Sequence, residues 1–157
     1  MNDIDATLKQ LGISLPVPAA PVANYVAFVR SGNLLIISGQ LPFGPDGQLA
    51  ERHKGKLGVN VFHEAGQEAA QLCAINILAQ AKLALGSLNK ITRCLKLNGF
   101  INCAPGFHAI APVMNGASDL MVKVLGDAGR HARAAVGVAE LPLNAAVEVD
   151  AMFEISE

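Results

Sequence analysis

The sequence is short of charged and aromatic side chains. Of its 157 residues only 16% are charged and 4% aromatic, with no tryptophan and one tyrosine, although 52% are hydrophobic. Soluble domains usually carry about 25% charged residues. A domain with so few polar side chains is therefore expected to bury part of its surface against other copies of itself. The hydrophobic fraction and a net charge of −1 exclude a disordered chain and give no general attraction to nucleic acid or anionic membranes.

Long apolar runs, a basic N-terminus and paired cysteines are also missing. The two longest stretches without a charged residue, 10–29 and 97–118, are interrupted by prolines, so neither predicts a transmembrane helix. The chain begins with acidic rather than basic residues, which argues against a secretory signal. An odd cysteine count without CxxC spacing predicts buried thiols in a reducing, cytoplasmic setting. These cysteines are Cys73, Cys94 and Cys103.

The histidines and the glycine-containing turns match no established ligand pattern. No histidine pair has the HExxH spacing of a zinc site. The turns at 44–47 and 126–129 match neither a P-loop nor a dinucleotide-binding loop. The sequence therefore predicts no metal ion and no cofactor.

Hydrophobic periodicity predicts three helices and five strands. The helices are expected at residues 4–11, 62–85 and 112–125, and the strands at 25–30, 34–38, 91–101, 133–139 and 146–155. This order predicts one α+β domain over residues 1–157, in which a mixed sheet carries two long helices on one face. Residues 1–24 are expected to form a short helix and a proline-rich extension. The other face of the sheet is expected to be covered by another subunit.

Arg133 stands out because the residues after it are small and apolar. A guanidinium in such a setting keeps its charge and needs an anionic partner. That partner is either a structural carboxylate or the carboxylate of a substrate, and the sequence favours neither. A hairpin between strands 133–139 and 146–155 would place Arg133 and Glu148 on one face, roughly 13 Å apart. The two groups would then meet a common ligand more easily across a subunit boundary.

Two further features allow either a structural or a functional interpretation. Ser38 ends a strand, and its hydroxyl is either an ordinary strand-end group or a hydrogen-bond donor to a ligand. Arg52, Lys54 and Lys56 lie in a polar loop, which predicts either a solvated loop or a contact with phosphate. Because the net charge is −1, this single cluster gives little support to RNA binding.

Two segments resemble a known family. Asn24-Tyr25-Val together with Ser31-Gly-Asn-Leu-Leu-Ile-Ile-Ser38-Gly-Gln-Leu-Pro42 resembles the first hairpin of the reactive-intermediate deaminase (Rid, or YjgF-like) family. Residues 132–151 resemble the family's signature hairpin. The likeness runs from about residue 25 to 155 and implies a chorismate-mutase-like fold. It also implies a homotrimer whose sheets pack into a central β-barrel, with three clefts between neighbouring subunits.

The resemblance implies a reaction and roles for four residues. Well-studied family members hydrolyse small enamine or imine intermediates to 2-keto acids and ammonia, without a metal or cofactor. By this likeness Arg133 would hold the substrate carboxylate, and Glu148 would orient or activate the attacking water. Tyr25 would line the cleft and Ser38 would help to position the substrate. An imine carbon is already electrophilic, so positioning and one proton-transfer group suffice.

The chain departs from the deaminase subgroup at two positions. Ala135 stands where that subgroup has a cysteine, and Ala111 stands where it has a cleft-lining asparagine. The N-terminal extension resembles a longer branch of the family, in which Asn115 and His131 are either polar cleft residues or an ordinary helix amide and loop imidazole. Two alternatives to hydrolysis stay open: a non-catalytic binder or sensor of small carboxylates, and an RNA-directed ribonuclease activity. The low basicity disfavours the second.

Overall fold

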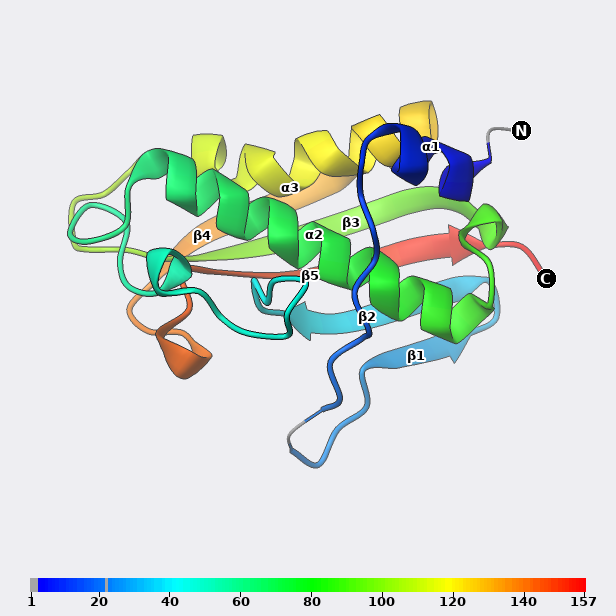
Figure 1. Ribbon diagram of the computed structural model, residues 1–157, viewed down its shortest axis with the longest axis horizontal. Helices are drawn as coiled ribbons and strands as arrows, with labels where there is room; N and C mark the ends of the chain where they lie inside the picture. Colours follow the sequence, from blue (N-terminus) through cyan, green and yellow to red (C-terminus); the bar gives the residue numbers. More distant parts are fainter. Residues whose placement is uncertain (1–2, 22) are drawn as a thin grey trace.

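The computed structural model describes residues 3–21 and 23–157 and shows a mixed α+β single domain (Figure 1). Its sheet has five strands in the order β1-β2-β5-β3-β4. The strands are β1 (Phe28–Ser31), β2 (Leu34–Gln40), β3 (Ile91–Asn102), β4 (Ala132–Val138) and β5 (Val147–Ile155), and the helices are α1 (Ile4–Gln10), α2 (His63–Leu85) and α3 (Ile110–Leu125). The packing of α2 and α3 against one face of the sheet confirms the predicted arrangement of the two long helices.

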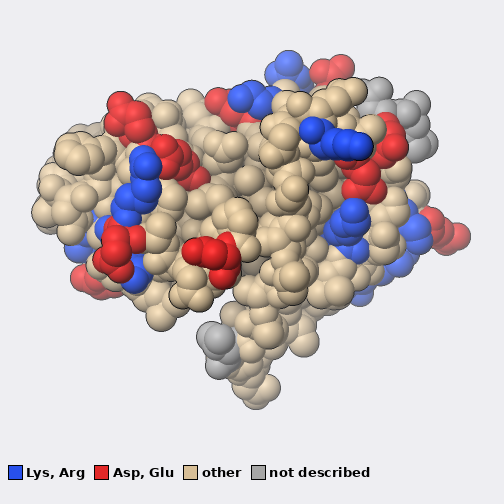
Figure 2. All heavy atoms as spheres, viewed as in Figure 1, with Lys and Arg blue, Asp and Glu red and all other residues tan. Residues whose placement is uncertain are grey.

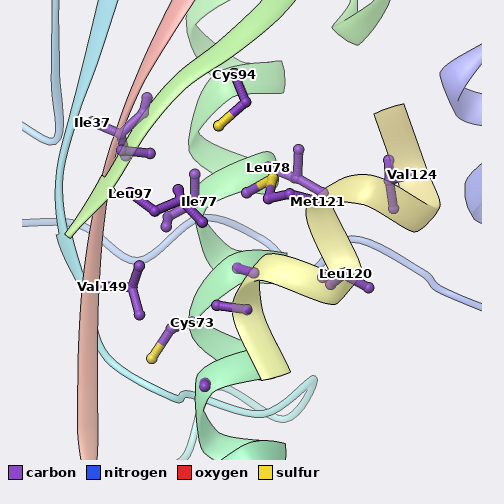
Figure 3. Close-up of a cluster of buried hydrophobic side chains, with 14 of the residues drawn as sticks. Ile37, Cys73, Ile77, Leu78, Cys94, Leu97, Leu120, Met121, Val124 and Val149 are labelled. Carbon is purple, nitrogen blue, oxygen red and sulfur yellow. The ribbon is translucent and has the colours of Figure 1, made fainter. Parts of the chain in front are cut away.

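Small side chains let α2 lie close to the sheet. Six of its thirteen buried residues are alanines, and alanine combines high helix propensity with little bulk. Figure 3 shows Ile77 and Leu78 of α2 in one cluster with Met121 of α3, and with Leu97 and Val149 of the sheet. All five of these side chains are fully buried, so the core is aliphatic, as the composition predicts.

The cysteines contribute to this core rather than to a reactive site. Cys73 and Cys94 are buried, whereas Cys103 is only partly buried. Burial raises the pKa of Cys94 to about 12, which keeps its sulfur in the protonated thiol form. The prediction of buried thiols is confirmed for the first two of the three.

The predicted alternation of the last strand is confirmed, and it explains why β5 is central. Its five odd-numbered residues are all buried. β5 pairs with β2 on one side and with β3 on the other. A strand with a fully apolar face is stabilised most in the middle of a sheet, where both of its edges are hydrogen-bonded and helices cover that face.

The sheet face away from the helices carries exposed apolar side chains. Val29, Ile36 and Val136 are 50%, 39% and 48% exposed. Val29 pairs directly with Ile36 on the neighbouring strand, so the two form one apolar row. This composition suits the predicted cover by other subunits, while the trimer and its barrel stay predictions.

The predicted hairpin between strands 133–139 and 146–155 is wrong. β3 lies between them, parallel to β4 and antiparallel to β5. The physical reason is α3, which connects β3 to β4 while packing on the sheet. A chain that returns through such a helix re-enters the sheet parallel to the strand it left.

The N-terminal segment crosses α2 on the outside of the molecule (Figure 1). Gln80 of α2 donates a hydrogen bond of 2.9 Å to the carbonyl oxygen of Ala19 and so ties this segment down. The predicted short helix is confirmed as α1. Of the predicted 1–24 extension, residues 1, 2 and 22 lie outside the described residues. No helix among the described residues is long and apolar enough to cross a membrane.

The first strand begins later than predicted. β1 starts at Phe28, whereas the sequence places its start at Tyr25. The amide of Tyr25 donates instead to the carbonyl oxygen of Ala23, at 2.8 Å, which closes a local turn. Tyr25 is therefore a loop residue beside the edge of the sheet.

Candidate functional site

Arg133 lies on the edge strand β4 and points toward α3. Its pairing partner on β3 is the fully buried Leu97, which places Arg133 on the helix-covered face of the sheet. Nη1 of Arg133 donates to Oδ1 of Asn115 at 2.8 Å and to Oγ of Ser118 at 3.1 Å. Nη2 donates to the carbonyl oxygen of Ala111 at 3.4 Å. The fold therefore brings Asn115 into contact with Arg133, while its role as a cleft residue stays a prediction.

The three acceptors come from one stripe of α3. Residues spaced by three and four positions share a helix face, so Ala111, Asn115 and Ser118 all face β4. Ala111 contributes only its carbonyl group, because its side chain is a methyl group. Asn115 supplies a side-chain amide one turn later than the asparagine of the deaminase subgroup.

Every acceptor of Arg133 is electrically neutral. Among residues 3–21 and 23–157, no carboxylate lies within salt-bridge distance of its guanidinium. Glu148 is not its partner within the chain. The described residues of one chain therefore provide no structural carboxylate for Arg133, and its positive charge remains available to an anionic group.

His131 belongs to the same network but does not touch Arg133. Its Nε2 lies 2.9 Å from Oγ of Ser118, and its Nδ1 lies 2.7 Å from the carbonyl oxygen of Gly129. The imidazole thus contacts Ser118 on the side away from Arg133. The structure places it one hydrogen bond away from the residues that hold Arg133, and its role as a cleft residue stays a prediction.

A second group of polar residues surrounds a β-bulge in β2. The register with β5 shifts between Ile37 and Gln40, so Ser38 and Gly39 together stand opposite Asp150. Bulges re-aim side chains at sheet edges and next to active sites. This one opens a hollow of about 290 Å³ on the uncovered face of the sheet.

Glu148 of β5 lies against this bulge. A Cβ atom on Gly39 would overlap Oε1 of Glu148, so the glycine makes room for the carboxyl group. Partial burial raises the pKa of Glu148, and the nearby charge of Asp150 raises it further. A carboxyl group with a raised pKa exchanges protons closer to neutral pH than an exposed one does.

Arg133 and Glu148 lie on opposite faces of the sheet. Arg133 shares a row with Leu97 and Ala151, which are both buried under the helices. Glu148 pairs with Phe100, three residues further along β3, and strand residues three apart point to opposite faces. The predicted shared face is therefore wrong, because it rested on the hairpin that does not form. Within one chain the two side chains cannot contact the same small molecule.

Ser38 lies at the bulge, on the Glu148 side of the molecule, and Tyr25 directly precedes Val26, with which Ser38 forms a hydrogen bond. Oγ of Ser38 donates to the carbonyl oxygen of Val26 at 2.7 Å, which leaves its lone pairs for another partner. Tyr25 is 51% exposed. The fold thus divides the predicted site residues into two half-sites. The β4 half-site comprises Arg133, Asn115 and His131 with Ser118, and the β2 half-site comprises Ser38, Glu148 and Tyr25 with Gly39.

Sequence reasoning missed Ser118 and Gly39. Ser118 carries a weak signal, its spacing of three residues from Asn115 on a predicted helix. Gly39 carries none, because a glycine at the end of a strand usually indicates only a turn. Its role depends on a carboxyl group more than 100 residues later in the chain.

The basic loop is neutralised by its own surroundings. Arg52 forms an ion pair with Glu68 at 3.0 Å, and Lys54 forms one with Glu51 at 2.8 Å. Lys56 donates to Oδ1 of Asn102 at 2.7 Å and to the carbonyl oxygen of Ala139, and lies 3.6 Å from Glu140. Figure 2 shows charges of both signs side by side on the helix-covered face, with no field of one sign. This pairing supports the solvated-loop interpretation.

Fold and half-sites together define a small α+β domain that presents, at one edge of its sheet, an arginine with no carboxylate partner in the part of the chain that the structure describes. A protein-family model described as "YjgF/chorismate_mutase-like, putative endoribonuclease" matches residues 5–155. The chain therefore belongs to the YjgF/Rid family, as the resemblance predicts.

Three relatives illustrate the range of names in this family. The chain is 48% identical to Protein TCP17 of Trypanosoma cruzi, over 98% of this chain and 94% of the relative. It is 32% identical to the 2-iminobutanoate/2-iminopropanoate deaminase of Dermatophagoides farinae, over 91% and 94% of the two chains. The crystal structure of Atu1372 from Agrobacterium tumefaciens has a TM-score of 0.90 at 54% identity, covering 98% of this chain and 92% of that one.

Proposed function

We propose that the protein hydrolyses small 2-imino acids to 2-keto acids and ammonia, at a site formed between two copies of the chain. The observation that carries the proposal is the guanidinium of Arg133, which is held by three neutral acceptors and has no carboxylate partner among the described residues. Such a group suits the carboxylate of a small substrate. The deaminase relative from Dermatophagoides farinae acts on 2-imino acids by its name, which supports the same substrate class.

Glu148 is the proton-transfer group of the proposed reaction. Water oxygen bonds to the imine carbon while the carbon–nitrogen π electrons move to nitrogen, and Glu148 carries a proton from the water to that nitrogen. The product of this step is a carbinolamine. Its remaining carbon–nitrogen single bond then breaks, the hydroxyl proton passes to the departing nitrogen to give ammonia, and a carbonyl group is left. One water is consumed for each ammonia released. The raised pKa of Glu148 brings its proton exchange closer to neutral pH.

Two copies are required because one chain separates the half-sites. Arg133 lies under the helices at the β4 edge, and Glu148 lies on the uncovered face two strands away. The exposed apolar row on that face favours association with further copies. We propose the trimer with a central barrel that the family resemblance implies, with the β4 half-site of one subunit facing the β2 half-site of the next.

The decay of 2-iminopropanoate generated in solution tests the proposal. We expect the protein to accelerate its decay and the Arg133→Ala variant to lose at least tenfold in kcat/KM, because a charged hydrogen-bonding partner is removed. Arg130→Ala is the matched control, since Arg130 is exposed and pairs only with Asp127. An acceleration that is absent, or that survives in Arg133→Ala, would contradict the proposal.

A non-catalytic binder of small carboxylates is the second candidate. The observation in its favour is that Ala135 and Ala111 replace the polar side chains of the deaminase subgroup. It predicts thermal stabilisation by 2-oxobutanoate, lost in Arg133→Ala, without any change in the decay of the imine. The family description also mentions endoribonuclease activity, but the ion pairs of Arg52, Lys54 and Lys56 with glutamates leave little free positive charge for RNA.

A further inference from the structure

We propose that Ser118 and His131 are positioning residues, which fix the edge of the Arg133 guanidinium that a ligand carboxylate meets. The inference rests on the carboxylate-binding role proposed for Arg133, and it adds the orientation of that contact. Neither residue touches the ligand in this proposal. Both act through Arg133.

The carbonyl oxygen of Gly129 sets the direction of the whole chain of hydrogen bonds. A carbonyl oxygen can only accept, so Nδ1 of His131, 2.7 Å away, must donate. In the neutral imidazole the other nitrogen, Nε2, is then an acceptor. The hydroxyl of Ser118, 2.9 Å from Nε2, therefore donates to His131 and turns its lone pairs toward Arg133.

Counting the donors of Arg133 identifies its free edge. A guanidinium has five N–H groups. Nη1 donates one proton to Asn115 and the other to Ser118. Nη2 donates one of its two protons to the carbonyl oxygen of Ala111. One N–H of Nη2 and the N–H of Nε remain without a partner among the described residues.

In this proposal Ala111 accepts the Nη2 proton that faces Nη1, which leaves free the Nη2 proton beside Nε. That proton and the N–H of Nε form the side-on edge of the guanidinium, which matches the two oxygens of a carboxylate in a bidentate pair. The end-on edge between Nη1 and Nη2 is closed, because Nη1 has no proton left. Asn115 and Ser118 close it together, and His131 keeps the Ser118 hydroxyl in the accepting orientation.

Binding of 2-oxobutanoate, the product of 2-iminobutanoate hydrolysis, tests this orientation. In protein labelled with ¹⁵N-arginine, the Nε–H resonance of Arg133 is identified by its loss in Arg133→Lys. We expect 2-oxobutanoate to shift this resonance in the wild type. We expect Ser118→Ala to raise the dissociation constant about tenfold and to reduce the shift, because Nη1 regains a free proton.

Conservative variants separate positioning from a structural role. Ser118→Thr keeps the hydroxyl and is expected to bind within about twofold of the wild type, whereas His131→Phe, which removes the acceptor, is expected to weaken binding in the same direction as Ser118→Ala. Asp119→Ala changes the neighbouring, exposed position of α3 and is the matched control. In turnover, KM is expected to rise in Ser118→Ala while kcat stays close to wild type, since carboxylate binding is the same in ground and transition states.

The outcomes distinguish this inference from the proposed function. Two outcomes would overturn the inference and leave the proposed function standing. In the first, 2-oxobutanoate binds in an Arg133-dependent manner but binds to Ser118→Ala as it does to the wild type. In the second, it binds in this manner without moving the Nε–H resonance. If binding depends on both residues but the imine is not hydrolysed, the inference holds and the proposed reaction fails. If the wild type does not bind 2-oxobutanoate, both fail.

Discussion

At the scale of single residues, the neutral surroundings of Arg133 are the most informative feature. A buried or half-buried arginine is usually matched by a carboxylate, because an uncompensated charge is costly away from water. Here an amide, a hydroxyl and a carbonyl group hold the guanidinium in place without neutralising it. The side chain is thus ordered in advance, and a ligand need not supply the energy to orient it.

Glu148 gives a residue-scale prediction for stability. Its pKa is raised in the folded protein by burial first and by Asp150 second. Such a carboxyl group loses its proton less easily when folded than when unfolded, so the folded state is penalised as pH rises above the unfolded pKa. We expect Glu148→Gln to raise the unfolding temperature at neutral pH, and we expect the gain to vanish in acid, where both states are protonated.

Thermal unfolding measured from pH 4 to 8 tests this prediction. Glu154→Gln is the matched control, because Glu154 is an exposed glutamate on the same strand and glutamine can still accept from Thr92. A Glu148→Gln variant that is less stable than the wild type at pH 7, or a gain that grows as the pH falls, would contradict the assignment.

At the scale of elements, α2 and α3 approach each other through a glycine. A Cβ atom on Gly116 of α3 would overlap the backbone carbonyl group of Gln67 of α2. The close approach brings α3 down onto the sheet and so determines how near its Asn115–Ser118 stripe lies to β4.

The Gly116→Ala variant tests this close approach. In an unconstrained helix the change would stabilise the protein by about 0.5–1 kcal/mol. Here we expect a loss of about 1–3 kcal/mol in the free energy of unfolding, because backbone atoms cannot move aside as a flexible side chain can. Denaturant unfolding gives the value, with Asp119→Ala as the exposed control on the same helix. A stabilised Gly116→Ala variant would exclude the close contact.

Lys56 joins two loops at the end of the sheet. Its Nζ donates to the fully buried Asn102 and to the carbonyl oxygen of Ala139, so it ties the loop before α2 to the connection between β4 and β5. That connection contains Leu143 and Asn144 at φ of 56° and 57°, a conformation that residues other than glycine seldom adopt. The tie holds this strained segment in place.

We therefore expect Lys56→Met to cost about 1–3 kcal/mol in the free energy of unfolding, since it leaves the Asn102 amide oxygen without its donor. Lys54→Met is the matched control and should cost less than about 0.5 kcal/mol, because its ion pair with Glu51 is a local one at the surface. Urea denaturation measures both, and equal losses would show that Lys56 is an ordinary surface lysine.

At the scale of the whole molecule, the strand order separates Arg133 from Glu148, so one chain cannot form the proposed site alone. Arg133 and Glu148 face opposite sides of the sheet, so in the proposed site the Glu148 carboxyl group comes from a second copy. Mixing two inactive variants tests this consequence directly. We expect subunits of Arg133→Ala and Glu148→Gln, unfolded and refolded together in equal amounts, to regain about a quarter of the wild-type activity. Half of the sites receive Arg133, and half of those receive Glu148.

Each variant refolded alone is the control and should stay inactive. A site built within one chain would be defective in every subunit, so the mixture would also stay inactive. That result would place catalysis in a single subunit and remove the composite site.

The helices and strands could be predicted from the sequence, whereas contacts between distant parts of the chain could not. The helix over 63–85 and the alternation of the last strand were predictable, because each depends on the periodicity of residues adjacent in the chain. Arg133 could also be picked out as a candidate site residue, since a cation among small apolar residues needs a partner wherever the segment lies. Ser118 and Gly39 were not, because their partners Arg133 and Glu148 are distant in the sequence.

By itself, then, the sequence determined the elements and the aliphatic core, and it predicted self-association and a site at Arg133. Only the tertiary structure decided the strand order, and with it the separation of Arg133 from Glu148. The physical reason is the packing of α3 on the sheet, which forces β4 to run parallel to β3 and leaves the central position to β5. The scarcity of charge pointed to a missing neighbour, and the fold identifies the half-site which that neighbour would complete.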